Sequence, residues 1–287
     1  MSDKGCGRDK VILWHILFKL KAMSKLFVLV MIFLWPVNLS ANESQDTCRL
    51  HVVYHYNFKE TTADDVMNMD DGMLEVGSNW SVFYTRNYRN DCEFADSLRR
   101  TRVKADDMIE IWMQRGLPQS RFKCAVYKNY PIEGALTCTD EVMQKYCYEE
   151  EMPTITWELV EGDSVVAGYA CKKAYGELRG RRWSVWYTLE IPYDDGPWKL
   201  CGLPGLIMAA NEDKGDFSFI CIGVQSVSSP MTFWDRPYIH CTPKELQDEK
   251  FDFWYDQSGY ADRQFGFASN KGADEVTHFT PCLIEYY

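Results

Sequence analysis

The sequence of 287 residues lacks the common motifs of catalysis and nucleotide binding. It has no G-x-S-x-G nucleophile elbow, no phosphate-binding G-x-x-x-x-G-K-[ST] loop and no G-x-G-x-x-G motif at the start of a helix. It also has no Pro/Ser/Gly-rich linker, internal repeat or low-complexity tract. These absences disfavour the common hydrolases, NTPases and dehydrogenases, and they favour one large domain.

Positively charged residues are outnumbered, because the sequence has 31 Lys and Arg against 42 Asp and Glu, which gives a net charge of −11. Nucleic acids and anionic membrane surfaces both require a cationic contact surface. We therefore expect neither partner. The acidic clusters, such as Asp70 and Asp71 or residues 149–151, do not fit a calcium loop and are typical of a solvated surface.

The longest apolar run covers residues 26–37, follows Lys25 and is followed by the small residues Ser40 and Ala41. This arrangement predicts a signal peptide over residues 1–41, with Met23 as an alternative start, and hence a periplasmic or secreted protein. A membrane span needs about 20 apolar residues, so we expect none in the mature chain. Cleavage after Ala41 would leave a net charge of −15. No cysteine adjoins this site, which disfavours a lipid anchor.

Ten of the eleven cysteines lie beyond the leader, and no CxxC motif occurs among them. In an oxidising compartment an even number of dispersed cysteines predicts disulfides, although their connectivity stays open. A zinc site built from His240, Cys241, His278 and Cys282 is the alternative, but it lacks the paired spacing of zinc motifs. We therefore expect no metal or cofactor, and the disulfide candidates are Cys48, Cys92, Cys124, Cys138, Cys147, Cys171, Cys201, Cys221, Cys241 and Cys282.

Apolar and polar residues alternate along residues 48–58, which is typical of a half-buried strand. Similar short segments recur from residue 124 to residue 224, separated by turn residues, and short connections favour antiparallel pairing. Residues 91–115 have helical periodicity and end before Gly116 and Pro118. The sequence thus predicts a mainly β, α+β fold. We expect an antiparallel meander of eight to ten strands, curved or closed into a partly open barrel and covered by one helix.

This β domain is expected to occupy residues 42–224. Residues 225–287 are rich in aromatic residues and show little periodicity, so we interpret them as an irregular wrap. Aromatic side chains that cover a sheet are the simpler explanation, and a binding surface built on aromatic anchors is the alternative.

The most informative stretch is a set of spaced residues that ends in a hexapeptide. Gly168, Cys171, Ala174 and Gly180 come first, Tyr187, Ile191, Gly196 and Pro197 follow, and the set ends in the hexapeptide Gly202-Leu203-Pro204-Gly205-Leu206-Ile207. The set resembles the signature of the GLPGLI family, uncharacterised exported proteins of the bacterial envelope, over residues 168–219 and more loosely over residues 48–115. The resemblance implies no catalytic residues. It suggests a binding surface made of Arg181, Trp186, Glu190, Pro192, Gly202, Leu203, Pro204, Gly205, Leu206 and Ile207.

Among the signature residues, Glu190 has the side chain that is best suited to bind a ligand or take part in a reaction. It is either a contact for a ligand or partner, or a structural acceptor that pairs with Arg181 or Arg182 or caps a turn. Pro204 and its flanking glycines predict a turn that leads into a strand.

Three functions follow as hypotheses. The first is a non-catalytic envelope scaffold that presents residues 192–206 to a protein partner, such as an outer-membrane transport system. The second is a carrier of an apolar ligand inside the curved sheet, and the third is an envelope hydrolase that uses Glu190. The oligomeric state stays open.

Overall fold

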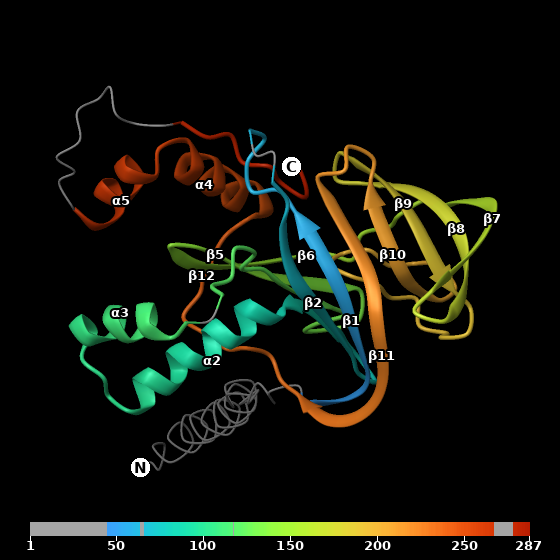
Figure 1. Cartoon of the computed structure of the whole chain (residues 1–287), viewed down its shortest axis with the longest axis horizontal. Coiled ribbons are helices and arrows are strands. Elements are labelled where there is room, and N and C mark those ends of the chain that lie inside the picture. Colours follow the sequence, from blue (N-terminus) through green and yellow to red (C-terminus); the bar gives the residue numbers. More distant parts are fainter. Residues whose placement is uncertain (1–44, 64–65, 117, 267–277) are drawn as a thin grey trace, which may run out of the picture. The chain divides into compact units, whose positions relative to one another are not determined.

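The structure is a computed structural model that describes residues 45–63, 66–116, 118–266 and 278–287 (Figure 1). The expected leader and its alternative start lie outside these residues. Residues 44–287 form one compact unit. Its elements in chain order are β1 (Asp46–Phe58), β2 (Asn68–Val76), β3 (Ser81–Thr85), α2 (Arg86–Arg100), α3 (Ala105–Gln114), β4 (Ala125–Lys128), β5 (Ala135–Val142), β6 (Gln144–Glu151), β7 (Glu158–Val166), β8 (Tyr169–Leu178), β9 (Arg181–Thr188), β10 (Leu206–Glu212), β11 (Phe217–Met231), β12 (Ile239–His240), α4 (Pro243–Tyr255) and α5 (Gln257–Phe265).

Twelve strands form one sheet in the order β12-β6-β5-β4-β3-β2-β1-β11-β10-β9-β8-β7. It consists of two antiparallel meanders, β1–β6 and β7–β11, which are joined where β1 pairs with β11. The hairpins β7–β8 and β8–β9 turn at Ala167-Gly168 and Arg179-Gly180, where both residues have positive φ. Two successive residues with positive φ are typical of two-residue hairpin turns, whose backbone twist fits that of the paired strands.

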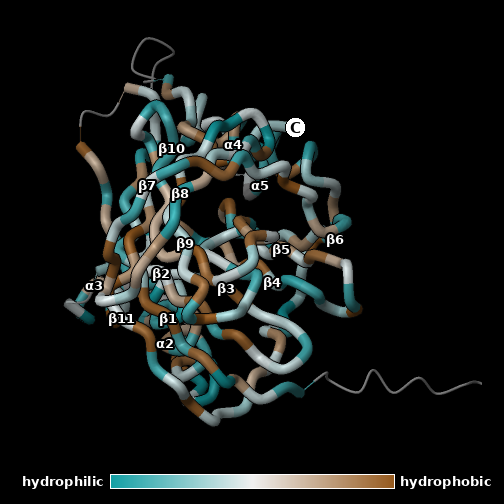
Figure 2. Tube along the Cα trace, turned by 90° about the vertical axis from the view of Figure 1, so that its right-hand side faces the viewer, coloured by the Kyte–Doolittle hydropathy of each residue, from teal (hydrophilic) through white to brown (hydrophobic). Residues whose placement is uncertain are grey.

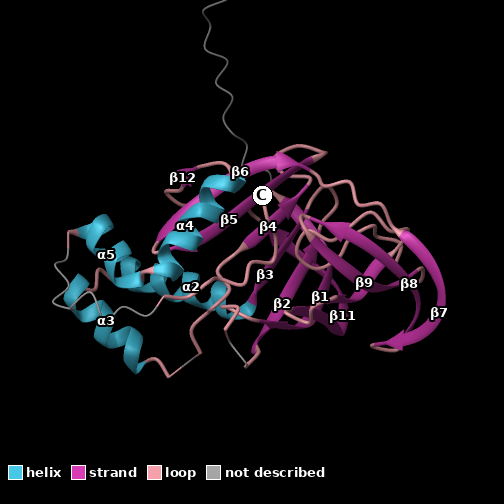
Figure 3. Ribbon diagram, turned by 90° about the horizontal axis from the view of Figure 1, so that it is seen from above, coloured by secondary structure: helices cyan, strands magenta, loops and turns pink. Residues whose placement is uncertain are grey.

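The sheet is strongly curved and does not close (Figure 3). Residues 152–157 connect β6, near one edge of the sheet, to β7 at the other edge. Six residues span at most about 20–25 Å even when fully extended, so the two ends of the sheet must curl toward each other. The predicted mainly β fold with a curved antiparallel sheet is therefore confirmed.

The core lies on both faces of the sheet. The alternation predicted in β1 is confirmed, because Val52, Tyr54 and Tyr56 have no exposed surface whereas Arg49 and His55 point outward. Figure 2 shows hydrophobic and hydrophilic segments interspersed along the chain. A second, smaller cluster covers the other face around Tyr84 and Tyr127.

The single helix expected at residues 91–115 is two helices, α2 and α3. The chain breaks at Thr101, whose hydroxyl donates to the carbonyls of Ser97 and Leu98, and Arg102 then takes a left-handed conformation with φ 53°. This conformation cannot continue a right-handed helix.

The tail is more regular than expected. β11 extends to Met231, and α4 and α5 follow it. Helix α4 begins with a capping box in which Thr242 and Glu245 bond each other's backbone N–H groups, with Pro243 in the first turn. These interactions satisfy N–H groups that a helix start leaves unpaired. Within the described residues, no helix is both long and apolar enough to cross a membrane.

Candidate functional site

The signature segment between β9 and β10 lies inside the curve of the sheet. Trp198, Lys199 and Leu200 have no exposed surface, and the Trp198 ring lies 6.0 Å from that of Trp183 on β9. The loop also bonds to itself, since the Gly202 N–H donates to the Asp194 carbonyl at 3.0 Å. We call residues 189–205 the inner loop, because its central residues, 195–201, are all buried.

Glycine is required in this loop by close packing. A Cβ atom on Gly205 would lie 2.0 Å from the Thr188 carbonyl oxygen, far inside contact distance, and Gly202 has φ +87°. Strand β10 starts at Leu206, directly after this turn. The predicted turn leading into a strand is therefore confirmed.

A buried lysine of the first meander holds the start of the inner loop. Lys128 on β4 is 1% exposed, forms an ion pair with Asp195 and donates to the Gly196 carbonyl at 2.6 Å. Because β4 and β9 belong to different meanders, this contact joins the two halves of the sheet through the loop.

A second buried lysine lies at the centre of the loop. Lys199 Nζ is 2.6 Å from Glu150 on β6 and 2.7 Å from Glu285 near the C-terminus, and it donates to the hydroxyls of Tyr148 and Tyr287 at 2.8 Å each. Burial disfavours the charged amine, but Glu285 and Glu150 outweigh this effect and raise the pKa of Lys199. We call these five residues the Lys199 cluster.

Arg181, like Lys199, is a buried cation that is held by carboxylates. It is 4% exposed, with Nη1 3.0 Å from Glu212 and 3.3 Å from Asp216, and its Nε donates to the Leu283 carbonyl at 2.7 Å. Burial of the guanidinium opposes its charge, but Glu212 in particular raises the pKa of Arg181. Arg181 thus fastens β9 to the C-terminal segment and does not pair with Glu190.

Glu190 is exposed and accepts a hydrogen bond from the Ala170 N–H at 2.9 Å. This geometry matches the capping alternative, although the group capped belongs to β8 and not to the glycine-rich loop. No neighbouring acid or base contacts its carboxylate among the hydrogen bonds and ion pairs of the described residues.

The structure separates the predicted binding residues by exposure. Leu203, Leu206 and Ile207 are buried in the core with Arg181 and Gly205, and Trp186 is half-buried on the outer face of β9 near Lys173. Surface positions are left only to Glu190, Pro192, Gly202 and Pro204. The signature is therefore mainly an internal packing motif.

No group of three or more His, Cys, Asp or Glu residues within the described parts of the chain could hold a metal ion. His55 lies 3.5 Å from Asp71, while His278 stacks on Tyr255. The described cysteines are all free thiols, so the disulfide prediction stays a prediction.

A hollow of about 820 Å³ lies at the end of the sheet near Phe58 and Phe217, and we call it the mouth hollow. Its walls come from residues 118–124, from β5, from α4 and from residues 281–284. Much of its lining is apolar and comes from distant parts of the chain, including Phe58, Phe122, Phe217, Phe253, Trp254 and Leu283.

Charged residues of the mouth hollow are arranged in pairs. Arg121 lies 2.6 Å from Glu60, and Lys250 on α4 lies 2.5 Å from Asp140 on β5. Burial opposes the charge of Lys250, but Asp140 raises its pKa, so Lys250 stays protonated at neutral pH. The hollow therefore combines apolar walls with charges that already neutralise one another.

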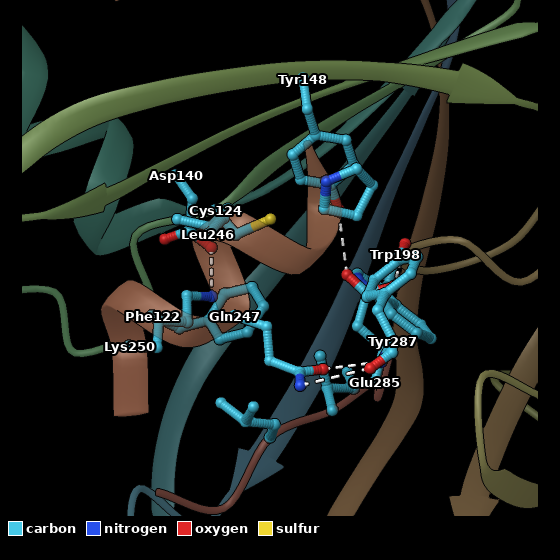
Figure 4. Close-up of a pocket in the computed structure, with 13 residues that line it drawn as sticks. Phe122, Cys124, Asp140, Tyr148, Trp198, Leu246, Gln247, Lys250, Glu285 and Tyr287 are labelled. Atoms are coloured by element: carbon cyan, nitrogen blue, oxygen red, sulfur yellow. Dashed lines mark hydrogen bonds and ion pairs between the residues drawn. The ribbon is translucent and has the colours of Figure 1, made fainter. Parts of the chain in front are cut away.

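A small adjoining cavity of about 30 Å³ has room for about one water molecule (Figure 4). It shares Phe122, Cys124, Asp140 and Lys250 with the mouth hollow, and Tyr148, Glu285 and Tyr287 line it as well. The Lys199 cluster thus lies at the inner end of this space.

The mouth hollow could not be located from sequence, although two signals pointed toward it. The capping box at Thr242 marks the start of α4, and the aromatic run that suggested a binding surface includes Phe253 and Trp254. Other aromatic residues of the tail, such as Phe233 and Trp234, instead pack on the outer core cluster. The sheet-covering interpretation therefore describes part of the tail, and the binding-surface alternative stays a prediction.

Comparisons with known proteins extend the description of the signature segment. A family model described as "Protein of unknown function (Porph_ging)" matches residues 177–209, which include β9, the inner loop and the start of β10. A search of curated proteins found no match.

Solved structures similar to this chain include two of PNGF-II, in different space groups. Each has a TM-score of 0.49 and 11% sequence identity over 72% of this chain. The match covers 34% and 33% of the PNGF-II chains, so this chain spans about a third of their length.

Proposed function

We propose that this protein is an exported, non-catalytic binding protein of the bacterial cell envelope that holds a partly apolar ligand in the mouth hollow. The observation that carries the proposal is a hollow of about 820 Å³ whose lining includes the aromatic side chains of Phe58, Phe122, Phe217, Phe253 and Trp254. The small cavity that adjoins it is lined by Trp198 of the inner loop. Ligand sites in proteins typically enclose about 300–1,000 Å³ and are lined mainly by apolar side chains.

The hollow also modifies the carrier hypothesis. The inward rows of the sheet are packed against the inner loop, because Tyr54, Trp183 and Trp198 have no exposed surface. An apolar ligand therefore has no room among these rows. The mouth hollow, at the end of the sheet near Phe58 and Phe217, offers the space instead.

The paired charges suggest a ligand of low net charge. Arg121, Lys250 and Lys123 each face a carboxylate, so a strongly charged ligand would have to break an ion pair. A molecule with a flat or aliphatic body and a few uncharged polar groups suits this lining best.

A half-buried tryptophan allows a direct test of ligand binding. Trp254 lines the hollow, whereas Trp112 is a half-buried tryptophan on α3 that does not. We would titrate wild type, Trp254→Ala and Trp112→Ala with anilinonaphthalene sulfonate. Native mass spectra of wild type purified from the envelope fraction would reveal any ligand that it retains.

We expect saturable dye binding by wild type and Trp112→Ala, and at least ten-fold weaker binding by Trp254→Ala. Equal binding by all three proteins, together with a ligand-free native mass, would refute the ligand proposal. Export is tested separately by cell fractionation and by sequencing of the N-terminus, which is expected at Asn42.

The scaffold hypothesis keeps one supporting observation. Leu189 is 50% exposed next to the turn at Gly205, and Pro192 and Pro204 are also exposed. A Leu189→Asp, Pro204→Asp variant is expected to lose any envelope protein that wild type retains in a pull-down. The Ile239→Asp variant, changed at a 43% exposed apolar residue on β12, is the control.

A further inference from the structure

Two cysteines meet behind the wall of the mouth hollow. Cys124 directly precedes β4, and Cys138 lies on β5 opposite Val126 in the antiparallel register. Since Cys124 is two residues before Val126, both cysteines point to the same face of the sheet. Their sulfur atoms are 3.3 Å apart, and the residues are only 5% and 1% exposed.

This pair stands out among the described cysteines, which are all thiols in the structure. Cys241 and Cys147 are also neighbours, but there the Cys241 sulfur faces the Cys147 carbonyl oxygen at 3.9 Å. Cys201, by contrast, is buried near Lys128 and Asp195. Within the described residues, Cys124 and Cys138 are thus the pair whose sulfur atoms are in direct contact.

We propose that Cys124 and Cys138 form a disulfide in the exported protein, produced by exchange with an oxidised protein dithiol. The strands already hold the two sulfur atoms in contact at 3.3 Å, whereas a disulfide needs them about 2.05 Å apart, so bond formation requires only a short further approach. The inference depends on the proposed export but not on the proposed ligand.

The reaction is balanced as a two-step exchange. One cysteine thiolate attacks the partner's disulfide, forms a mixed disulfide and releases one partner thiolate. The second cysteine thiolate then attacks the sulfur of the first, which forms the Cys124–Cys138 bond and releases the other partner thiolate. Two electrons pass to the partner, and the two protons of this chain's thiols go to solvent or to the released thiolates.

Burial determines when this exchange occurs. The hydrogen bond with Cys138 and the loss of solvent both raise the pKa of Cys124 well above its ordinary value. A thiol with a raised pKa is a poor nucleophile, and these two are also out of reach of a protein partner. The bond therefore forms before β4 and β5 are covered, and the folded, reduced protein oxidises slowly.

The bond would fix one wall of the mouth hollow. Cys124 lines both cavities, and Cys138 is two residues from Asp140, which carries the ion pair to Lys250 on α4. The cross-link therefore joins residues 118–124 covalently to the strand on which α4 rests.

Peptide mapping tests the bond directly, because trypsin cleaves after Lys123, Lys128 and Lys145. Residues 124–128 and 129–145 are then separate peptides with one cysteine each. We would alkylate unfolded wild type from the envelope fraction before digestion, and we would refold a second sample with oxidised glutathione. We expect the two peptides to be linked in both samples, two hydrogen masses lighter than their sum, and separated by a reductant.

Free, alkylated Cys124 and Cys138 in both samples would overturn the inference, as would the linkage of either one to a different cysteine. A bond in the refolded sample alone would support the geometry and refute export to an oxidising compartment. Mapping uses wild type, so no variant has to fold.

Stability gives an independent measurement. A disulfide that closes the loop between residues 124 and 138 should lower the equilibrium constant for unfolding by about two orders of magnitude relative to the reduced protein. The Cys138→Ala variant should lose this dependence on reductant, whereas Cys201→Ala should keep it. Equal reductant dependence of Cys138→Ala and wild type would contradict the assignment.

Discussion

Replacing Lys199 by methionine should destabilise the protein severely without changing its fold. The side chain is fully buried, and its ammonium group lies between the carboxylates of Glu150 and Glu285. Methionine preserves most of the volume but removes the charge. Glu285, which is 16% exposed, would then lose its cation, and Glu150 would keep only the partly exposed Arg179 at 2.7 Å.

The expected loss is about 3–5 kcal/mol of unfolding free energy, the usual cost of removing one partner from a buried ion pair. For a domain of this size such a loss lowers the melting temperature by on the order of 10 °C. The control is Lys244→Met, because Lys244 is 55% exposed and pairs with Asp248 one helical turn away. Exposed pairs of this kind contribute roughly 0.5 kcal/mol or less.

Urea unfolding followed by tryptophan fluorescence measures both variants, and pH adds a second criterion. The folded pKa of Lys199 is raised above its ordinary 10.5, so its contribution is complete below pH 10.5 and is lost as pH rises toward the folded value. Ionisation of buried tyrosines also destabilises the protein over this pH range, but these tyrosines are present in both wild type and variant. The difference between the two should therefore stay constant near neutral pH and shrink in strong alkali.

A loss below about 1 kcal/mol at neutral pH would refute the reasoning. It would mean that Lys199 is solvated, so that the inner loop does not lie between the two meanders.

Two further predictions concern the backbone. Gly205→Ala should cost more than about 2 kcal/mol or prevent folding, because its Cβ would clash with the Thr188 carbonyl, whereas Gly223→Ala has open space and should change stability by less than about 1 kcal/mol. Equal urea midpoints would contradict the packing of the loop. Thr242→Ala should cost about 1 kcal/mol through loss of the α4 capping box, and Thr242→Ser should restore most of it. Wild-type stability of the alanine variant in urea would show that the cap contributes nothing.

Local patterns predicted the strands whose two faces differ in environment. β1 was clear from sequence because one face enters the core and the other meets solvent. β2 was missed, since Asp70, Asp71 and Gly72 have the composition of a turn. In the structure Asp70 accepts backbone N–H groups, and a Cβ on Gly72 would lie 2.8 Å from the Phe83 ring, so these residues serve a strand.

Long-range contacts explain what the sequence could not predict. Lys199 meets Glu150 and Glu285, which are 49 and 86 residues away, and no local pattern encodes such a meeting. The mouth hollow likewise combines Phe58 with Phe253 and Leu283. The signature was found correctly as a turn before a strand, but its burial depends on side chains from the other meander.

The pairing of β1 with β11 has a consequence for biosynthesis. Tyr54 lies opposite Cys221, so the seam at the centre of the sheet needs residues that leave the ribosome more than 160 positions apart. Until the later strand arrives, β1 exposes an unpaired edge, which is a hazard for aggregation. A chain truncated before Phe217 would keep that open edge permanently, so we expect this protein to depend on chaperones until its synthesis is nearly complete.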